Sequence, residues 1–287
     1  MRLSITLSIV TALGALTVPS SALAATAARF VHVERFPSAV LGNARNITVM
    51  LPPSYEAKGT RRYPVLYAND GQNLFDERTA FIGREWKMDE TLLALYAAKA
   101  IPEIIVVGIW NTPARLEEYT PGPSGDRYLR FVSTELKPFI DARYRTWRGP
   151  KGTSVLGSSM GGLISTWAAL SFPDVFGQSA SLSAAFQFKG EAISEVLKTQ
   201  PKKKVRMYLD IGTDELPGEN GAKFAGYMAQ MRESLASAGY VEGRDLRTLI
   251  IPGGKHNEDA WAARLRDPLI FLYGRSAPAG PPVVPAP

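Results

Sequence analysis

Two adjacent serines stand in the stretch "GSSMG" (157 to 161), which joins an apolar run to a longer apolar, helix-like run. In the pattern Gly-x-Ser-x-Gly, small flanking residues let the chain turn sharply from strand to helix and expose a strained central serine. Only Ser159 is central, because Ser158 has Leu156 and Met160 at the glycine positions. Free N–H groups at the start of the next helix favour negative charge beside its hydroxyl. The spacing predicts that Ser159 is a nucleophile; the plainer alternative is a glycine-rich turn.

A serine nucleophile needs a base, and the chain has only two histidines. His256 lies in "IIPGGKHNEDAW", a glycine-bearing loop directly after the last predicted strand, where α/β enzymes build their sites. The chain order serine, acid, histidine of α/β-hydrolases also favours His256 as the base. His32 lies near the N-terminus on a predicted edge strand, where a surface or packed histidine is expected.

The acid that orients the imidazole should lie between the serine and the histidine, after the strand-like run "VRMYLDIG" (205 to 212). The following "GTDEL" supplies Asp214 and Glu215, and Asp210 lies inside the strand itself. Either loop residue could reach the histidine, so the residue pattern leaves Asp214 and Glu215 open.

Negative charge that develops on the substrate needs two N–H donors, which form an oxyanion hole. One donor is expected from the backbone of Met160, the residue after the nucleophile. The other should come from a loop after an early central strand. The segment "YANDGQNLFDE" (67 to 77) follows such a strand and turns at an Asp-Gly pair. An ordinary turn is the alternative for this segment.

Short apolar runs that alternate with helical patterns must position these residues. Strands are predicted at 46–52, 63–69, 103–110, 153–158, 177–184, 205–212 and 246–253. Helices are predicted at 88–100, 128–144, 160–172 and 221–239, the second interrupted by Pro138. The central strands are almost continuously apolar, as in strands covered on both faces. The pattern predicts one α/β domain over residues 25–275, with a mostly parallel central sheet and helices on both faces.

The N-terminus predicts export. Arg2 precedes an uncharged apolar run from Leu3 to Val18, which ends in the small-residue pattern "ALA" (22 to 24). The run is shorter than the roughly 20 residues of a spanning helix. Residues 1–24 are therefore predicted to be a signal peptide, with a periplasmic or secreted mature protein, and a retained anchor is the alternative. No membrane span is expected after cleavage, and the proline-rich tail 276–287 is expected to be disordered.

Charge and composition limit the partners and cofactors. The net charge of +6 arises from 33 basic and 27 acidic residues spread along the chain, which does not suggest a nucleic-acid partner. The one dense basic run, "PKKKVR" (201 to 206), is expected to be a solvated loop, with a polyanion contact as the alternative. The absence of cysteine excludes disulfides and thiolate metal sites. No metal or organic cofactor is expected.

Several blocks in the same order resemble the "putative esterase" family of α/β-hydrolases, over roughly residues 45 to 273. That family includes feruloyl and acetylxylan esterases, S-formylglutathione hydrolases, enterochelin esterases and mycolyltransferases. The blocks that carry the resemblance are "YPVLYANDGQNLFDE", "IIVVGIWNTPARLEEYTP", "ELKPFIDARYRT", "SVLGSSMGGLISTWAALSFPDVFG", "LDIGTDE" and "GGKHNEDAW".

The resemblance implies Ser159 as nucleophile, His256 as base and Glu215 as acid, with Asp214 second. It implies that Gln72 donates the second oxyanion N–H and that Arg115 and Tyr119 contact the substrate. Where the family often reads "SPAFW", this chain has "SAAFQF", which leaves one pocket wall undefined.

The expected function is hydrolysis of a carboxylic ester, such as an acylated carbohydrate or a siderophore lactone, by an exported serine esterase. An acyltransferase on the same triad and a non-catalytic carbohydrate- or siderophore-binding protein are the alternatives.

Overall fold

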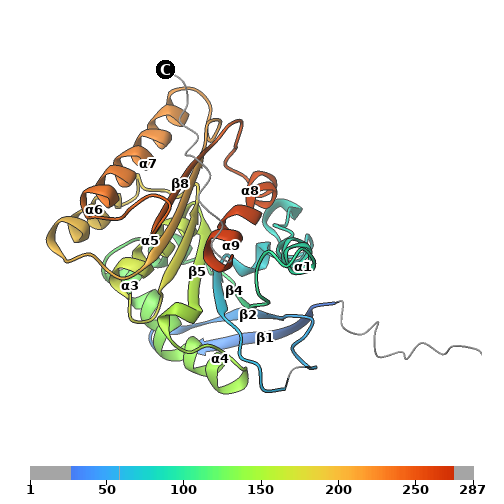
Figure 1. Cartoon of the computed structure of the whole chain (residues 1–287). Coiled ribbons are helices and arrows are strands. Elements are labelled where there is room, and N and C mark those ends of the chain that lie inside the picture. The colour runs from blue at the N-terminus through green and yellow to red at the C-terminus, as the bar shows by residue number, and fades with distance from the viewer. Residues whose placement is uncertain (1–26, 58, 275–287) are drawn as a thin grey trace, which may run out of the picture.

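The computed structural model describes residues 27–57 and 59–274 (Figure 1). The expected signal peptide and the expected disordered tail lie outside these residues. The strands are β1 (Arg29–Ser38), β2 (Asn43–Leu51), β3 (Val65–Asn69), β4 (Ile105–Ile109), β5 (Thr153–Ser158), β6 (Gln178–Leu182), β7 (Arg206–Gly212) and β8 (Leu246–Ile251). The α-helices are α1 (Met88–Ala97), α2 (Arg115–Glu118), α3 (Pro123–Arg130), α4 (Lys137–Arg143), α5 (Met160–Ser171), α6 (Gly190–Thr199), α7 (Glu219–Ser237), α8 (Glu258–Arg264) and α9 (Arg266–Tyr273).

In the described chain the strands form one eight-stranded sheet in the order β1-β2-β4-β3-β5-β6-β7-β8. Strand β2 is antiparallel to both of its neighbours, and β3 to β8 run parallel to one another. All residues of β3, β4, β5 and β6 are buried. Strands β3 and β4 are mostly apolar, as expected of strands covered on both faces, whereas β5 and β6 also bury small polar residues such as Ser154 and Ser179. The predicted α/β fold with a mostly parallel central sheet is confirmed.

Helices cover both faces of the sheet (Figure 1). Because side chains alternate along a strand, Tyr67 of β3 belongs to the core beneath α3 to α7, whereas Leu66 and Ala68 belong to the core beneath α1, α8 and α9. The carboxyl ends of β3 and β5 are adjacent, and the segments that follow them, α1 and α5, pack on opposite faces. Such a reversal leaves a crevice at the carboxyl edge of the sheet.

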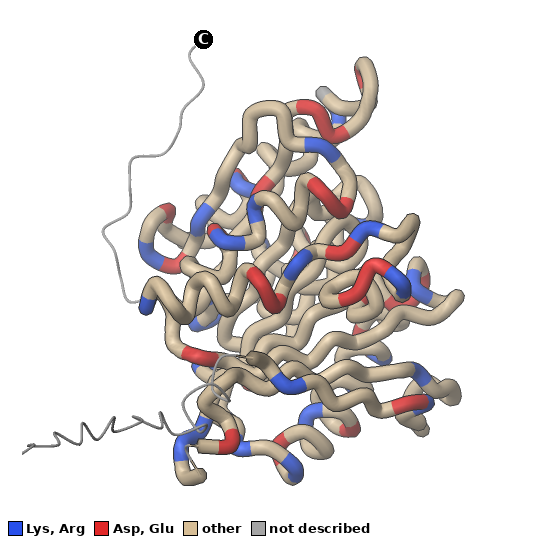
Figure 2. The backbone as a smooth tube through the Cα atoms, turned by 90° about the vertical axis from the view of Figure 1, so that its right-hand side faces the viewer, with Lys and Arg blue, Asp and Glu red and all other residues tan. Residues whose placement is uncertain are grey.

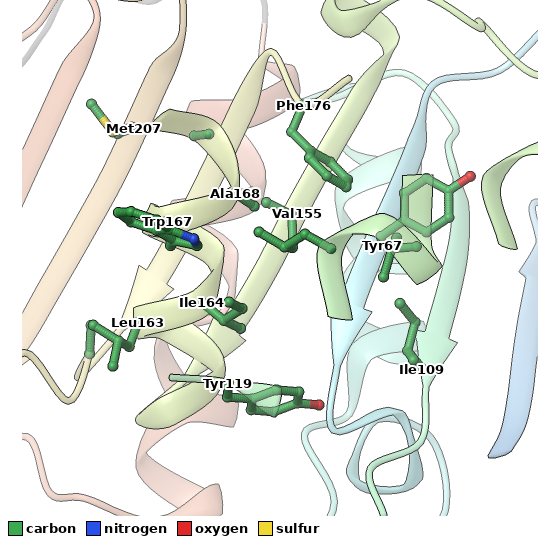
Figure 3. Close-up of a cluster of buried hydrophobic side chains, with 14 of the residues drawn as sticks. Tyr67, Ile109, Tyr119, Val155, Leu163, Ile164, Trp167, Ala168, Phe176 and Met207 are labelled. Atoms are coloured by element: carbon green, nitrogen blue, oxygen red, sulfur yellow. The ribbon is translucent and has the colours of Figure 1, made fainter. Parts of the chain in front are cut away.

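Helix α5 is the most deeply placed helix, with every residue from Met160 to Leu170 buried. Ile164 and Ala168 of α5 lie beside Val155 of β5 in the cluster of Figure 3. Burying a Val, Leu or Ile side chain contributes about 1.5–3 kcal/mol. This packing fixes the start of α5, and with it the turn at residue 159.

The predicted interruption at Pro138 takes the form of a π-helical turn. Helix α3 continues through the π-helical segment Phe131–Leu136 into α4, and the Lys137 N–H donates to the Val132 carbonyl. Proline lacks an N–H and clashes with the preceding turn, so the wider turn lets it enter near the start of α4.

Basic and acidic residues alternate over the face shown in Figure 2, as expected from their similar numbers. Within the described residues, no helix has both the length and the hydrophobicity needed to cross a membrane.

A buried ion pair ties β2 to α2. The Arg45 guanidinium donates to both carboxylate oxygens of Glu118, at 3.0 and 2.6 Å. The side chains of Arg45 and Glu118 are 0% and 7% exposed, and the guanidinium lies 4.8 Å from the ring centre of Phe131. The attraction between two buried charges offsets the free energy lost when they leave water, but only while both charges are present.

Glu118→Gln is expected to destabilise the protein by about 3 kcal/mol, because it leaves the Arg45 charge buried without a counter-ion. Urea unfolding followed by tryptophan fluorescence measures the change. Glu56→Gln is the matched control, since the Arg29–Glu56 pair is 61% and 69% exposed and should contribute little. Equal stability of the two variants would contradict this role of the buried pair.

Candidate active site

The sharp turn predicted at Ser159 is present between β5 and α5. Ser159 has φ 53° and ψ −123°, a conformation that L-residues rarely adopt. A Cβ on Gly157 would lie 2.5 Å from the carbonyl of Gly161, so the strand can approach the helix this closely only with glycine at 157. The Ser159 N–H donates to the Leu182 carbonyl of β6 at 3.0 Å, which fixes the turn against the next strand.

The structure brings His256 to Ser159. His256 Nε2 lies 2.9 Å from the Ser159 Oγ, although the two residues are 97 positions apart in the chain. The imidazole is held edge-on between Phe224 and Trp261, with ring centres 5.1 and 5.0 Å away. The two aromatic rings restrict rotation of the imidazole, so the contact with Ser159 is built into the packing.

The other side of the imidazole meets Glu215. His256 Nδ1 lies 2.7 Å from Glu215 Oε2, and Glu215 Oε1 accepts from the Ser183 hydroxyl at 2.6 Å and the Gly212 N–H at 2.5 Å. Burial opposes ionisation, but the bonds from His256, Ser183 and Gly212 together lower the pKa of Glu215. The Glu215 carboxylate therefore contributes to the stability of the fold at pH values above its ordinary pKa of 4.5. This contribution is lost as the pH falls through the lower pKa that Glu215 has in the folded protein.

A buried arginine completes the surroundings of the acid, and nothing in the sequence pattern pointed to it. Arg264 Nη2 lies 3.2 Å from Asp210 Oδ1 and 3.5 Å from Glu215 Oε1, and it also donates to the Ser183 hydroxyl. Burial raises the pKa of Asp210 to about 6, while Arg264 acts in the opposite direction. One guanidinium thus offsets two buried carboxyl groups. Arg264 is the last residue of α8, eight positions after His256, and this spacing alone gives no sign of its role.

Two residues that were weighed from the sequence lie outside this arrangement. Asp214 is exposed, and its Oδ1 accepts from the hydroxyl of Thr213. His32 lies on the edge strand β1, with Nδ1 3.2 Å from Thr48 Oγ1. Neither is within hydrogen-bond distance of the Ser159 hydroxyl or the His256 ring.

The expected oxyanion donors lie on the two segments that meet at the carboxyl ends of β3 and β5. Gln72 lies in a 3-10 turn (Gly71–Asn73) directly after β3, and Met160 is the first residue of α5. Among the described residues, neither backbone N–H has an acceptor. The Gln72 side chain accepts from the Asn111 N–H at 3.2 Å, which anchors the loop to the end of β4.

Arg115 and Tyr119, expected to contact the substrate, both bind Asp70. Arg115 binds both carboxylate oxygens of Asp70 at 2.7 Å, and Asn111 Nδ2 donates to one of them at 2.6 Å. The Asp70 N–H donates to the Tyr119 hydroxyl at 3.3 Å. Tyr119 is fully buried and offers no surface to a substrate, whereas the Arg115 side chain is 31% exposed. Asp70 has φ 56°, so these contacts fix a strained residue two positions before Gln72.

A hollow of about 800 Å³ opens beside His256. It is lined by the 213–218 loop, the first turns of α7 and the segment from Lys255 to Asn257. Leu216 is the most exposed large apolar side chain of this lining, at 38%. The hollow lies on the side of His256 that carries Glu215, and its lining does not include Ser159.

Comparison with solved structures defines the fold class. A ferulic acid esterase matches with a TM-score of 0.68 at 21% identity, covering 86% of this chain and 98% of that chain. An IroE-like serine hydrolase from Shewanella oneidensis matches with a TM-score of 0.68 at 23% identity, covering 85% and 80%. The enterobactin esterase of Shigella flexneri gives 0.68 at 21%, and this chain covers 59% of that chain. The chain has the α/β-hydrolase fold.

Sequence comparison gives the family. The family model described as "Putative esterase" matches residues 38–272, and the chain belongs to this esterase family. The uncharacterized protein YbbA of Bacillus subtilis (strain 168) is 27% identical over 249 residues, which are 81% of this chain and 94% of YbbA. YjcH of the same organism is 29% identical over 188 residues, covering 64% and 73%. Family membership supports a hydrolase that acts on esters.

Glu215→Gln is expected to lower kcat/KM for a p-nitrophenyl ester by about 10⁴-fold, because a neutral amide no longer orients the imidazole or stabilises its charged form. Asp214→Asn is the matched control and should change kcat/KM by less than about twofold, since its carboxylate faces Thr213. A larger loss in Asp214→Asn than in Glu215→Gln would contradict the geometry.

Proposed function

We propose that the protein is a serine carboxylic-ester hydrolase. The observation that carries the proposal is the unbroken series Ser159 Oγ to His256 Nε2 at 2.9 Å and His256 Nδ1 to Glu215 Oε2 at 2.7 Å. Nucleophile, base and orienting acid in hydrogen-bond contact are the constellation that acyl transfer through serine requires. Membership of the esterase family supports this assignment.

In the first half of the reaction, His256 Nε2 takes the Ser159 proton as Oγ attacks the ester carbonyl. The negative oxygen of the tetrahedral intermediate accepts from the N–H groups of Gln72 and Met160. Donors that are fixed before reaction stabilise this charge without reorganising, and one such donor contributes about 10²–10³-fold to kcat. Collapse of the intermediate expels the alcohol, which takes its proton from His256, and leaves an acyl-serine.

In the second half, His256 activates a water that attacks the acyl-serine. The acid is released and the proton returns from His256 to Ser159. Glu215 stays ionised throughout, because its lowered pKa favours the carboxylate while the imidazole carries a positive charge.

The substrate class that fits is an acylated carbohydrate or a siderophore lactone. Among the structural neighbours, one is described as a ferulic acid esterase and another as an enterobactin esterase. The open hollow beside His256 accommodates a bulky group, and the exposed face of Arg115 offers a cation to an acidic one. A panel of esters that varies the acyl and alcohol parts separately distinguishes these substrates.

Ser159→Ala is expected to lower kcat for a p-nitrophenyl ester by at least about 10⁴-fold and to abolish labelling by a fluorophosphonate probe. Ser158→Ala is the matched control: Ser158 is 3% exposed, belongs to β5 and should retain both activity and labelling. Circular dichroism checks that both variants are folded. Hydrolysis or labelling that persists in Ser159→Ala would overturn the mechanism.

We also propose that the protein is exported after cleavage behind Ala24, on the basis of the N-terminal sequence alone. The expected result is a mature N-terminus at Ala25 when the full chain is expressed in a bacterial host and purified from the periplasm or medium. N-terminal sequencing measures this. A protein that retains Met1 and stays in the cytoplasm would contradict export.

A further inference from the structure

The basic run 201–206, predicted to be a solvated loop, begins as an exposed loop and borders a hollow at the opposite ends of the strands from Ser159. The hollow measures about 820 Å³ and lies at the amino ends of β5, β6 and β7. Its lining comes from segments 150–151, 173–178 and 202–206, with Leu272 of α9. We call it the amino-edge groove.

The groove is built by backbone hydrogen bonds between its segments. The Gly177 N–H donates to the Pro150 carbonyl at 3.0 Å, and the Arg206 N–H donates to the Gly177 carbonyl at 3.0 Å. The Lys203 N–H donates to the hydroxyl of Tyr240 at 3.1 Å. The Lys203 backbone and the Lys202–Asp245 pair therefore anchor the run, in which Lys202 and Lys204 are exposed.

Positive charge exceeds negative charge in the lining. The lining has one carboxylate, Asp174, and five cations, which are Lys151, Lys202, Lys203, Lys204 and Arg206. Lys202 is paired with Asp245. The other four cations have no carboxylate partner in the part of the chain that the structure describes.

Lys203 and Arg206 are the least exposed of the four cations that have no described carboxylate partner, and Arg206 contacts only neutral groups. Its guanidinium is partly buried and donates only to neutral acceptors, Gln178 Oε1 at 3.1 Å and the Phe271 carbonyl at 2.9 Å. Burial lowers the pKa of Arg206, because the guanidinium loses hydration that no described carboxylate replaces. A planar guanidinium with unused N–H donors is suited to a carboxylate.

We propose that the amino-edge groove binds an acidic polysaccharide through the carboxylates of successive sugar residues. Several cations along one hollow suit a polymer that carries an anionic group on each repeat unit better than they suit a ligand with a single anionic group. Pro150 is exposed and Pro173 is half-buried, so both can supply apolar surface to the C–H faces of sugar rings. A chain of phosphates has no such faces. The groove lies at the opposite strand ends from Ser159, so the proposal is independent of the chemistry at that serine.

The test measures binding of fluorescently labelled polygalacturonate fragments by anisotropy, with the full chain carrying Ser159→Ala so that no ester chemistry intervenes. The double variant Lys203→Gln/Lys204→Gln is expected to weaken binding by about fivefold per lysine removed. Lys99→Gln/Lys223→Gln is the matched control, since it removes the same charge from exposed lysines outside the groove and should bind normally. Arg206→Gln should also weaken binding.

Three outcomes would overturn the proposal: no binding of polygalacturonate, equal weakening in the two double variants, or tighter binding of linear polyphosphate than of polygalacturonate. The last result would show that the groove responds to charge alone. Circular dichroism checks that both double variants are folded. Because binding is measured without turnover, its failure leaves the proposed hydrolase untouched, and the converse also holds.

Discussion

The architecture depends on one constraint, the close approach of β5 to the start of α5. The strand and the helix can approach closely enough only because residue 157 has no Cβ, and the turn holds Ser159 at a positive φ. A strained residue of this kind costs of order 1–3 kcal/mol and persists only where its surroundings over-determine it. Here the surroundings are the fully buried body of α5 and the hydrogen bond from the turn to β6. The buried body of α5 therefore fixes the strained turn that carries Ser159, and the Ser159 hydroxyl lies within hydrogen-bond distance of His256.

On each side of the Ser159 turn, an arginine binds a buried carboxylate. On one side Arg264 lies between Asp210 and Glu215, so that the carboxylate facing His256 is held by a fixed cation and by donors from Ser183 and Gly212. On the other side the Asp70–Arg115 pair fixes the loop that carries Gln72. Neither ion pair touches the Ser159 hydroxyl. Each holds a backbone or a carboxylate where the chemistry needs it, which explains why charged side chains are buried this close to the site.

The sequence predicted the features of the fold and of the site that depend on residues close together in the chain. Glycine spacing around Ser159, alternation of apolar runs and the scarcity of histidine predicted the sheet, the turn and the histidine loop. The residue pattern alone did not decide whether Asp214 or Glu215 is the acid beside His256. The two residues are adjacent in the chain, and only the packing of the 213–218 loop determines which side chain faces the imidazole. Ser183 and Arg264 escaped notice, since their roles arise from contacts between β6, β7 and α8. Helices α6, α8 and α9 were also missed. Helices α8 and α9 have only seven and eight residues, so tertiary packing rather than a long periodic pattern defines them. Tyr119 was expected to contact the substrate and is buried against Asp70, a contact that the sequence pattern did not indicate because the two residues are 49 positions apart.

The two ends of the parallel strands give this molecule two functional edges. Ser159 follows the carboxyl end of β5, while the four unpaired cations lie at the amino ends of β5 to β7. A polymer bound in the amino-edge groove would leave Ser159 accessible. It would also keep other polymer chains that associate with the bound one close to Ser159. Tethering of this kind raises the effective concentration of substrate without adding any contact at the reacting bond. Selection on such an enzyme can then adjust residence on the polymer and the rate of bond cleavage separately, since the two properties reside in different loops of one rigid sheet.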